Sequence, residues 1–475
     1  MHQPEHQARL PRGWLPFIAA GLAMRILFIA FPRPGDDDTL DYLQLGHNLL
    51  HQGIYGAGTG SDISPSLYRL PAYPIFLASF EQLFSRFWPT NWMNAVFVAQ
   101  LFFDIAAGLL LAAFARRHLS ERAGRLALAL AMLCPFTAVY SAIAMPECLT
   151  VFAIALGVYS AGRALAAEAA GQRDLSALLL AGCASALAML LRPDGALLFV
   201  SLAGGLFYYT FRSRNLTSVS SHTLRRSLTA LASFCLAALL PLSIWTARNW
   251  VEFHVFQPLA PRYLNDPGDR INSGFYRWTR TWAVEYVTTA NVLWEAGEGP
   301  IDTNDLDPSE LNPGAFDSPQ QRVETLELIA EYNRTNTISP ELDSRFASLA
   351  AERIRAHPFR YYVTFPVLRV ADMLLRPRTL EFDLDVFWWR WSEHHDQTAW
   401  AILLGLINLF YVAAAAWAFV RRRVPWAWML GGYLVLRFLM LGTIEHPEPR
   451  YTVECFPIFV IAAAAALTAR REPLG

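Results

Sequence analysis

The sequence predicts an all-α polytopic membrane protein, a bundle of about 10 transmembrane helices with roughly 9 to 12 as the range. Of its 475 residues, 54% are hydrophobic and only 17% are charged, whereas soluble domains carry about 25% charged residues. Many apolar runs approach the roughly 20 residues that cross a bilayer as a helix. The formal net charge of -1 excludes a strongly basic nucleic-acid-binding protein.

The first apolar run, 13–31, is interpreted as an uncleaved transmembrane helix, because no small-residue cleavage site of a signal peptide precedes Pro32 and Arg33. The five cysteines lie in or beside apolar runs at wide spacings, which predicts neither a disulfide framework nor a zinc site. The other predicted spans are 92–115, 125–145, 148–166, 175–191, 195–211, 227–247, 399–420, 424–443 and 452–469.

Arginine is distributed unevenly between the loops that join these runs. If the N-terminus is cytoplasmic, most loop arginines fall on one side, which the positive-inside rule assigns to the cytoplasm. We therefore expect a multi-pass protein of the bacterial inner (plasma) membrane with both termini in the cytoplasm. The arginine-rich stretches are the N-terminus, 116–124, 163–174, 212–226, 421–423 and 470–475.

This topology predicts three parts. Residues 1–247 form an N-terminal transmembrane bundle that includes a large first outer loop, 32–91. Residues 248–398 form a periplasmic or interfacial segment after the seventh helix, and residues 399–475 form the C-terminal transmembrane helices.

Two stretches of the periplasmic segment have interpretable patterns. Residues 319–357 have helical patterning, and Ser339 followed by Pro340 is typical of a helix cap and a first-turn proline. Residues 358–376 are apolar but carry three charged side chains, so we expect this stretch to lie along the interface or on the bundle rather than to span.

The stretch PGDDDTLDY, 34–42, places four carboxylates at the start of a predicted amphipathic helix that ends near Gly53. Acids at this position cap free amide groups and complement the helix dipole. One aspartate would suffice for the cap, which leaves a working role open for the others. A metal held by Asp36, Asp37 and Asp38 is an alternative, but the ligand set is unclear, so we expect no metal or other cofactor to be required.

Arg69 lies between Tyr68 and Leu70, shortly before two prolines, at the predicted outer edge of the membrane. A planar guanidinium held beside tyrosines suits the phosphate of a lipid headgroup. Tyrosine and arginine also favour this depth as interfacial anchors, so the residue type alone does not decide between the two roles.

Further polar motifs fall on the same predicted side. AMPECL contains Glu147, a carboxylate so close to hydrocarbon that it needs a partner or a task. LRPDG contains Arg192 and Asp194, which a local ion pair or a helix cap also explains. The last motif, EHPEPRY, supplies Glu445, His446, Glu448, Arg450 and Tyr451. Since these motifs come from separate parts of the chain, they predict a pocket that receives an anion and performs acid–base work.

The stretch DTLDYLQLGHNLLHQGIYG, followed by YRLPAYPIFLA, resembles the start of GT-C glycosyltransferases, particularly the bacterial family 39 group. Asp38 and Tyr42 match the first spacing of that pattern, and Ala72 stands where it usually has glycine. MPECL, LRPDG and EPRYTVECFPIF resemble later signatures in the same order. The other matching positions are Gly53, Tyr55, Arg69, Pro71, Tyr73 and Pro74.

The resemblance implies a GT-C-type bundle and a hexosyl or pentosyl transferase that uses a polyprenyl-phosphate-linked sugar on the periplasmic side. Relatives include protein O-mannosyltransferases and the aminoarabinose transferases of lipid A. The catalytic acid of the family corresponds to Asp38, with Asp37 and Glu147 as further candidates. The expected donor-phosphate ligands are Arg69, Arg192 and Arg450, and the expected pocket residues are Tyr42, Tyr68, Tyr73, His446 and Tyr451.

The expected partners are the lipid-linked donor, a lipid, glycan or protein acceptor, and membrane lipids, without nucleic acid. One alternative is a flippase or transporter for a lipid-linked sugar. Against it, the chain has no evident inverted repeat and few charges at mid-membrane depth beyond Arg25, Asp104 and Arg437. A second alternative is a non-catalytic protein of envelope polysaccharide assembly.

Overall fold

The computed structural model of the chain describes residues 12–32, 37–212, 221–288 and 305–468. In the first half of the chain, the elements are η1 (Arg12–Trp14), α1 (Leu15–Ala30), α2 (Asp37–Gln52), β1 (Gly56–Ala57), β2 (Ser64–Pro65), α3 (Ala72–Phe84), α4 (Met93–His118), α5 (Glu121–Met132), α6 (Pro135–Ala138), η2 (Val139–Ala142), α7 (Glu147–Ala169), α8 (Leu175–Leu191), η3 (Pro193–Gly195), α9 (Ala196–Arg212) and α10 (Ser221–Phe253).

The second half of the chain is also helical. Its elements are α11 (Ser273–Thr279), η4 (Pro308–Glu310), η5 (Pro313–Ala315), α13 (Pro319–Thr335), α14 (Pro340–Ala356), η6 (Arg360–Thr364), α15 (Phe365–Leu375), η7 (Leu380–Phe382), α16 (Trp391–Val420), α17 (Ala427–Leu441), η8 (Pro449–Cys455) and α18 (Phe456–Thr468).

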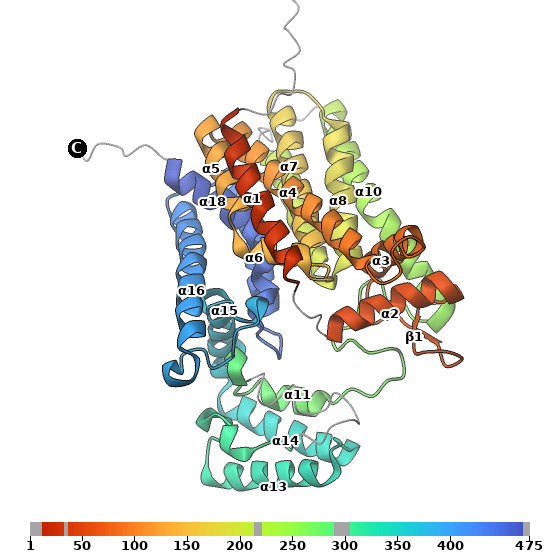
Figure 1. The fold of residues 1–475 in the computed structure, drawn as a ribbon, viewed down its shortest axis with the longest axis vertical. Coiled ribbons are helices and arrows are strands. Elements are labelled where there is room, and N and C mark those ends of the chain that lie inside the picture. The colour runs from red at the N-terminus through yellow and green to blue at the C-terminus, as the bar shows by residue number, and fades with distance from the viewer. Residues whose placement is uncertain (1–11, 33–36, 213–220, 289–304, 469–475) are drawn as a thin grey trace, which may run out of the picture. The chain divides into compact units, whose positions relative to one another are not determined.

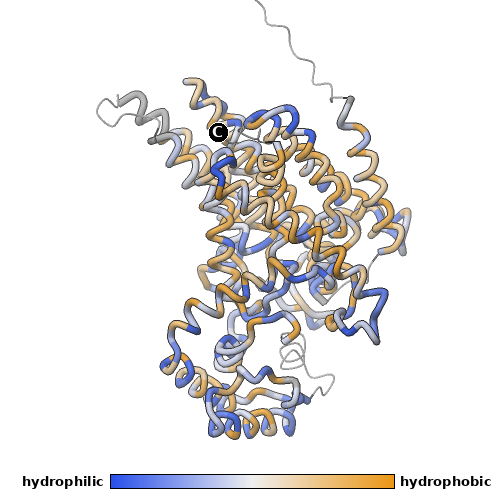
Figure 2. Tube along the Cα trace, turned by 90° about the vertical axis from the view of Figure 1, so that its left-hand side faces the viewer, coloured by the Kyte–Doolittle hydropathy of each residue, from blue (hydrophilic) through white to orange (hydrophobic). Residues whose placement is uncertain are grey.

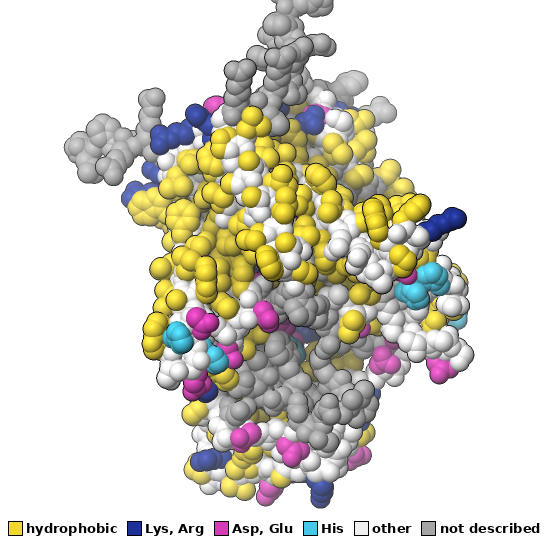
Figure 3. Space-filling view, viewed as in Figure 1, with side chains coloured by type: hydrophobic (Ala, Val, Ile, Leu, Met, Phe, Trp, Pro, Cys, Tyr) yellow, Lys and Arg dark blue, Asp and Glu magenta, His cyan; other side chains and the backbone are white. Residues whose placement is uncertain are grey.

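The chain divides into two compact units. Unit 1 comprises Met1–Pro267, Ala413–Leu434 and Glu454–Gly475, and unit 2 comprises Gly268–Val412 and Val435–Val453. Within unit 1, α4 packs against α5 and α7, α8 packs between α7 and α10, and α1 lies against α4 and α5 (Figure 1). Figure 2 shows the helices of this bundle as mainly hydrophobic, and Figure 3 shows hydrophobic side chains over their visible surface.

Within the described residues, each predicted span other than 125–145 coincides with continuous helical structure, which confirms the expected all-α polytopic class. Among the described residues, five helices are long and apolar enough to cross a membrane, and three shorter helices are also apolar. The five are Met93–His118, Glu147–Ala169, Leu228–Phe253, Trp391–Val420 and Pro449–Thr468, and the shorter ones are Leu15–Ala30, Leu175–Leu191 and Ala427–Leu441.

The run 125–145 is broken rather than straight, which corrects the expectation of one continuous span. Its two halves meet at an angle of 52°, because Cys134 is extended and Pro135 starts the next helix. Proline has no backbone N–H group, so it cannot donate the hydrogen bond that would continue the α-helix. Arg25 of α1 donates to the freed carbonyl of Met132 at 2.8 Å and to the carboxylate of Asp104 in α4. Arg25 and Asp104, two of the three charges expected at mid-membrane depth, are therefore paired inside the bundle.

The segment between α1 and α4 carries α2, a short hairpin and α3. The strands β1 and β2 are antiparallel, with Gly56 opposite Pro65. The helices α2 and α3 approach closely because Gly46 has no Cβ; a Cβ there would lie 2.7 Å from the carbonyl oxygen of Pro74. The segment packs against α10 in a small hydrophobic core, formed by Leu45, Tyr55, Leu67 and Leu70 with Trp245 of α10.

Unit 2 has a separate hydrophobic core around Phe275, Trp278 and Phe346. The side chain of Ser339 accepts a hydrogen bond from the backbone of Leu342, which confirms the predicted cap of α14. The stretch 358–376 forms η6 and α15 and is not among the candidate spans of the described helices. Its Arg369 is buried and donates to the carbonyl of Ala283 at 2.8 Å.

Candidate active site

Two aspartates of α2 share one arginine from the loop before α3. Asp38 and Asp41 are three residues apart and therefore lie on the same face of the helix. The Nη2 atom of Arg69 lies 2.5 Å from Asp38 Oδ1 and 2.8 Å from Asp41 Oδ2. The Nε atom of Arg69 also donates to Asp41 Oδ2 at 3.2 Å. Asp41 is thus a direct partner of Arg69.

Two tyrosines flank the same guanidinium. The carbon Cζ of Arg69 lies 5.2 Å from the ring centre of Tyr42 and 5.6 Å from that of Tyr68, which are cation–π distances. Burial alone would lower the pKa of Arg69, but the nearby Tyr42, Asp38 and Asp41 outweigh it and raise the pKa. Burial, together with the charge of Asp41, raises the pKa of Tyr68. The arginine is therefore held fully charged in a partly desolvated site.

A second cluster surrounds Arg192, which directly follows α8. Its Nη1 atom lies 2.6 Å from Oε1 of Glu147 at the start of α7. Its Nε atom lies 3.3 Å from Asp194 in η3 and 3.2 Å from Glu454 in η8. Both glutamate side chains are fully buried. The local ion pair of Arg192 with Asp194 is present, but it is only one part of a larger cluster.

Glu147 has one partnered and one unpartnered oxygen. Within the described part of the chain, no hydrogen bond reaches its buried Oε2 atom. A buried carboxylate is costly unless it is paired, and Arg192 supplies one pairing only. Glu147 therefore has the capacity to accept a further hydrogen bond.

Tyr42 lies between the two clusters. Burial raises the pKa of its phenol to about 12. The negative charges of Asp38 and Glu147 also raise this pKa, whereas the positive charges of Arg69 and Arg192 lower it. Charged groups of both clusters therefore act on this one hydroxyl group. The ring of Tyr42 also meets the edge of the Tyr73 ring, with centres 5.3 Å apart.

Gln100 of α4 supports this arrangement and was missed by the sequence reasoning. Its Nε2 atom donates to the carbonyls of Tyr140 and Ile143 at 3.0 and 2.8 Å, and its Oε1 atom accepts from the Tyr73 hydroxyl at 2.7 Å. Thr39 of α2 donates to the carbonyl of Ala144. The turn before Glu147 is thus tied to α4 and α2. The sequence could have indicated Gln100, because it is a polar residue inside an apolar run. The structure shows that it is fully buried.

Glu454 was also missed, although the sequence contains it in the quoted motif EPRYTVECF. Glu454 is an acidic residue within apolar sequence, and Glu147 was singled out for this same property. Asp36 lies outside the described residues, and the side chain of Asp37 does too, although α2 begins at this residue. The roles expected for these two aspartates stay predictions.

The residues expected from the last polar motif belong to unit 2. There, Arg450 pairs with Glu448 at 2.5 Å, and the hydroxyl of Tyr451 donates to the same carboxylate at 3.1 Å. Burial, with the charge of Arg450, lowers the pKa of His446 to about 4. These residues form a cluster within their own unit, and their expected roles in donor binding stay predictions.

The family described as dolichyl-phosphate-mannose-protein mannosyltransferase has a model that matches residues 71–245. An oligosaccharyltransferase from Archaeoglobus fulgidus, tethered with an acceptor peptide that contains the NVT sequon, has a similar structure, with a TM-score of 0.51 and 12% identity. That match covers 96% of this chain and 49% of the other chain, so this chain spans about half the length of the archaeal protein.

A lower-scoring structure is ArnT from Cupriavidus metallidurans bound to undecaprenyl phosphate, with a TM-score of 0.42, 13% identity, and 96% of this chain and 78% of that chain covered. No curated protein matches the sequence. The family match begins at Pro71, after Arg69, and includes Glu147 at the start of α7 and Arg192 directly after α8. The fold is shared with the archaeal transferase. Residues 71–245 are therefore similar to this mannosyltransferase family, and the chain shares the fold of the archaeal oligosaccharyltransferase.

Proposed function

We propose that this protein transfers a hexose or pentose from a polyprenyl-phosphate-linked donor to an acceptor hydroxyl group. The observation that carries the proposal is the pair of arginine–carboxylate clusters around Tyr42, built from α2, α7, α8 and the loop before α3. The arginines suit a phosphate and the carboxylates suit a proton acceptor, and transfer from a lipid phosphate needs both.

In the proposed reaction, Asp38 takes the proton of the acceptor hydroxyl as its oxygen attacks the anomeric carbon. The bond between this carbon and the phosphate oxygen breaks, and the lipid phosphate leaves with the electron pair. No protein group has to protonate this leaving group. Arg69, with Arg192 as the second candidate, stabilises its charge in a site that is largely screened from water.

The shared contacts of Arg69 suggest how donor binding prepares the base. Without a donor, Arg69 neutralises Asp38 and Asp41 together through one Nη2 atom. A phosphate that binds the guanidinium competes with Asp38, whereas Asp41 keeps its bond to Nε. Asp38 then becomes a stronger proton acceptor when the donor is in place. Glu147 is the further candidate for accepting a hydrogen bond from the hydroxyl group of the acceptor substrate, because its second oxygen has no partner in the described structure.

We place the reaction on the periplasmic side of a bacterial inner membrane, because the loops opposite the proposed site are rich in arginine. The acceptor in this proposal is a lipid, glycan or protein. To identify the sugar and the acceptor, purified protein is incubated with a panel of polyprenyl-phosphate sugars and candidate acceptors, and the products are analysed by mass spectrometry.

The variant Asp38→Asn tests the proposed base. We expect transfer to fall about 100- to 10,000-fold, the usual contribution of a general base, with the fold retained because Asp41 still holds Arg69. The matched control is Asp62→Asn, which changes an exposed aspartate of the β1–β2 hairpin and should leave transfer unchanged. Undiminished transfer by a folded Asp38→Asn protein contradicts the assignment, and transport of the donor without any transfer favours a flippase.

A further inference from the structure

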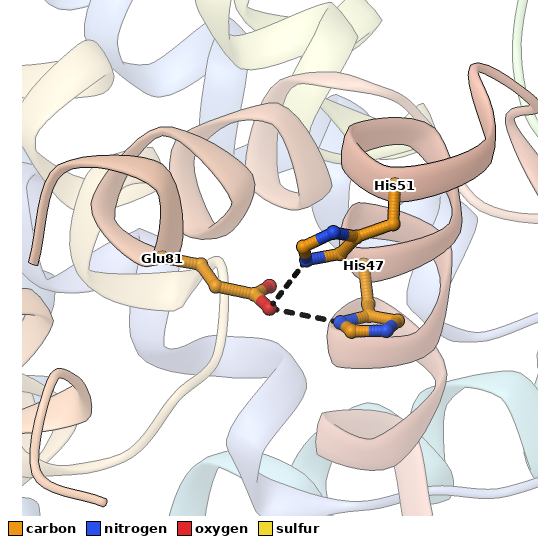
Figure 4. Close-up of side chains that lie close together, drawn as sticks. All are labelled: His47, His51 and Glu81. Carbon is orange, nitrogen blue, oxygen red and sulfur yellow. Dashed lines mark hydrogen bonds and ion pairs between the residues drawn. The ribbon is translucent and has the colours of Figure 1, made fainter. Parts of the chain in front are cut away.

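A separate cluster of ligand-type side chains lies where α2 packs against α3 (Figure 4). The Nδ1 atom of His47 lies 2.8 Å from Oε1 of Glu81, and the Nε2 atom of His51 lies 3.1 Å from the same oxygen. The two imidazole rings have centres 4.3 Å apart. All three ligand atoms lie within 4.8 Å of one another, so one ion can reach all of them.

The spacing and identity of these residues match a zinc-type donor set. Histidines at positions i and i+4 of a helix stand on one face, one turn apart, and this arrangement holds zinc with two imidazole nitrogens. A glutamate oxygen as third ligand completes the His₂Glu set known from zinc sites with an open fourth position. Imidazole nitrogen favours zinc and its first-row neighbours over magnesium and calcium, which prefer oxygen.

Hydrogen bonding alone accounts for the cluster less well. The side chains of His47 and His51 are 58% and 48% exposed, whereas Glu81 is 13% exposed. Exposed ion pairs of this kind contribute about 0–1 kcal/mol, which is little for two side chains that converge on one oxygen. Metal–ligand bonds of about 2.0–2.2 Å need ligand atoms slightly farther apart than the present 2.8 and 3.1 Å, a small side-chain movement at an exposed site.

We propose that His47, His51 and Glu81 bind one zinc-type divalent cation, which clamps α2 to α3, with water completing its coordination. The site is distinct from the Asp38–Arg69 cluster, because Asp41 and His47 are six residues apart, or about 9 Å along the helix. The clamp fixes α2 relative to α3. Since Asp38 and Asp41 lie on α2 and Arg69 lies in the short loop before α3, the ion stabilises the geometry of the acid–arginine cluster without taking part in it.

Binding is tested on the full-length protein purified without a histidine tag, by titration with Zn²⁺ alone from a metal buffer. We expect one ion per chain and an X-ray absorption spectrum with nitrogen and oxygen ligands near 2.0–2.2 Å. We also expect Zn²⁺ to raise the midpoint of thermal unfolding by at least about 2 °C at saturation, because a ligand that binds only the folded state stabilises it. Mg²⁺ at the same concentration should not.

Two variants and one control identify the ligands. Glu81→Gln keeps the shape of the side chain, and the double variant His47→Ala with His51→Ala removes both imidazoles. Each variant should weaken Zn²⁺ binding about tenfold or more. Each should also abolish the rise in the unfolding midpoint that Zn²⁺ produces. His357→Ala removes an exposed histidine elsewhere and should bind Zn²⁺ like the unaltered protein. Absence of Zn²⁺ binding by the unaltered protein, or equal affinity in Glu81→Gln, overturns the proposal.

Discussion

Arg69 is the residue on which most of the interactions in the proposed site depend. It contacts Asp38 through Nη2 and Asp41 through both Nη2 and Nε, and it lies against two tyrosine rings. Only a planar fork can make this set of contacts, because an ammonium group is a single point charge without a flat face. The same fork is the geometry that binds a phosphate through two oxygens. The identity of this side chain, and not only its charge, should therefore matter.

The variant Arg69→Lys keeps the charge and removes the fork. We expect it to raise the KM for the lipid-linked donor about tenfold, through the loss of about one charge-assisted hydrogen bond, with little effect on the KM for the acceptor. Steady-state kinetics with each substrate varied in turn measures the two effects. Arg86→Lys, at an exposed position after α3, is the matched control. An unchanged donor KM in Arg69→Lys speaks against phosphate binding by this residue.

At the scale of elements, the buried side-chain amide of Gln100 joins three elements near the candidate site by hydrogen bonds. The turn between η2 and α7 places Glu147, and its carbonyls are bonded to Gln100 of α4, which also accepts from Tyr73 of α3. Three elements are thereby joined by one side chain. Carbonyl groups in a turn inside an apolar bundle must be satisfied by some donor, and Gln100 supplies that donor here.

The variant Gln100→Leu has nearly the same volume and removes these hydrogen bonds. We expect a lower midpoint of thermal unfolding, because each buried group left without a partner costs about 1–3 kcal/mol. We also expect reduced transfer, since the turn that positions Glu147 loses its support. Differential scanning fluorimetry and the transfer assay measure the two effects. Gln82→Leu, on an exposed position of α3, should change neither, and an unfolding midpoint equal to that of the unaltered protein would refute the role of Gln100.

At the scale of the whole molecule, the chain builds two units with different means of stabilisation. Unit 1 is a bundle of apolar helices with paired charges inside, such as Arg25 with Asp104. Unit 2 contains amphipathic helices around an aromatic core and holds the partly buried His446 beside a charged arginine. A histidine held neutral by burial makes the stability of its unit depend on pH.

The direction of this pH effect follows from the pKa of His446. Its ordinary value of 6.5 falls to about 4 in the folded protein, so between these values the unfolded chain binds a proton that the folded chain does not. Stability is complete above about pH 6.5 and falls as the pH decreases toward 4. In His446→Gln, the loss of stability between pH 7 and pH 4.5 should be smaller than in the unaltered protein.

Thermal unfolding at a series of pH values measures this difference. The change at His446 is compared with His357→Gln, which alters an exposed histidine of the same unit and should follow the unaltered protein. Parallel pH dependence of the unaltered protein and His446→Gln would show that His446 does not contribute.

Several parts of the site were predictable because each is a local property of the chain. Asp38, Arg69, Glu147 and Arg192 stand out as charges beside apolar runs, where their cost demands a partner. The pairing of Asp38 with Arg69 agrees with this selection. The break after α5 was not predicted, because a hydropathy window averages over Cys134 and Pro135 and detects only that the whole run is apolar.

The all-α membrane class follows from the sequence alone, and Asp38, Arg69, Glu147 and Arg192 could be selected from it as candidates, since hydropathy and charge position are properties of residues close together in the chain. Which of these residues meet depends on the tertiary structure. Arg192 joins Glu147 to Glu454, Gln100 supports a distant turn, and Glu81 lies beside two histidines of α2. Such pairs depend on which helix faces pack together, and this depends on side-chain shapes summed over whole interfaces, which no local pattern in the sequence records.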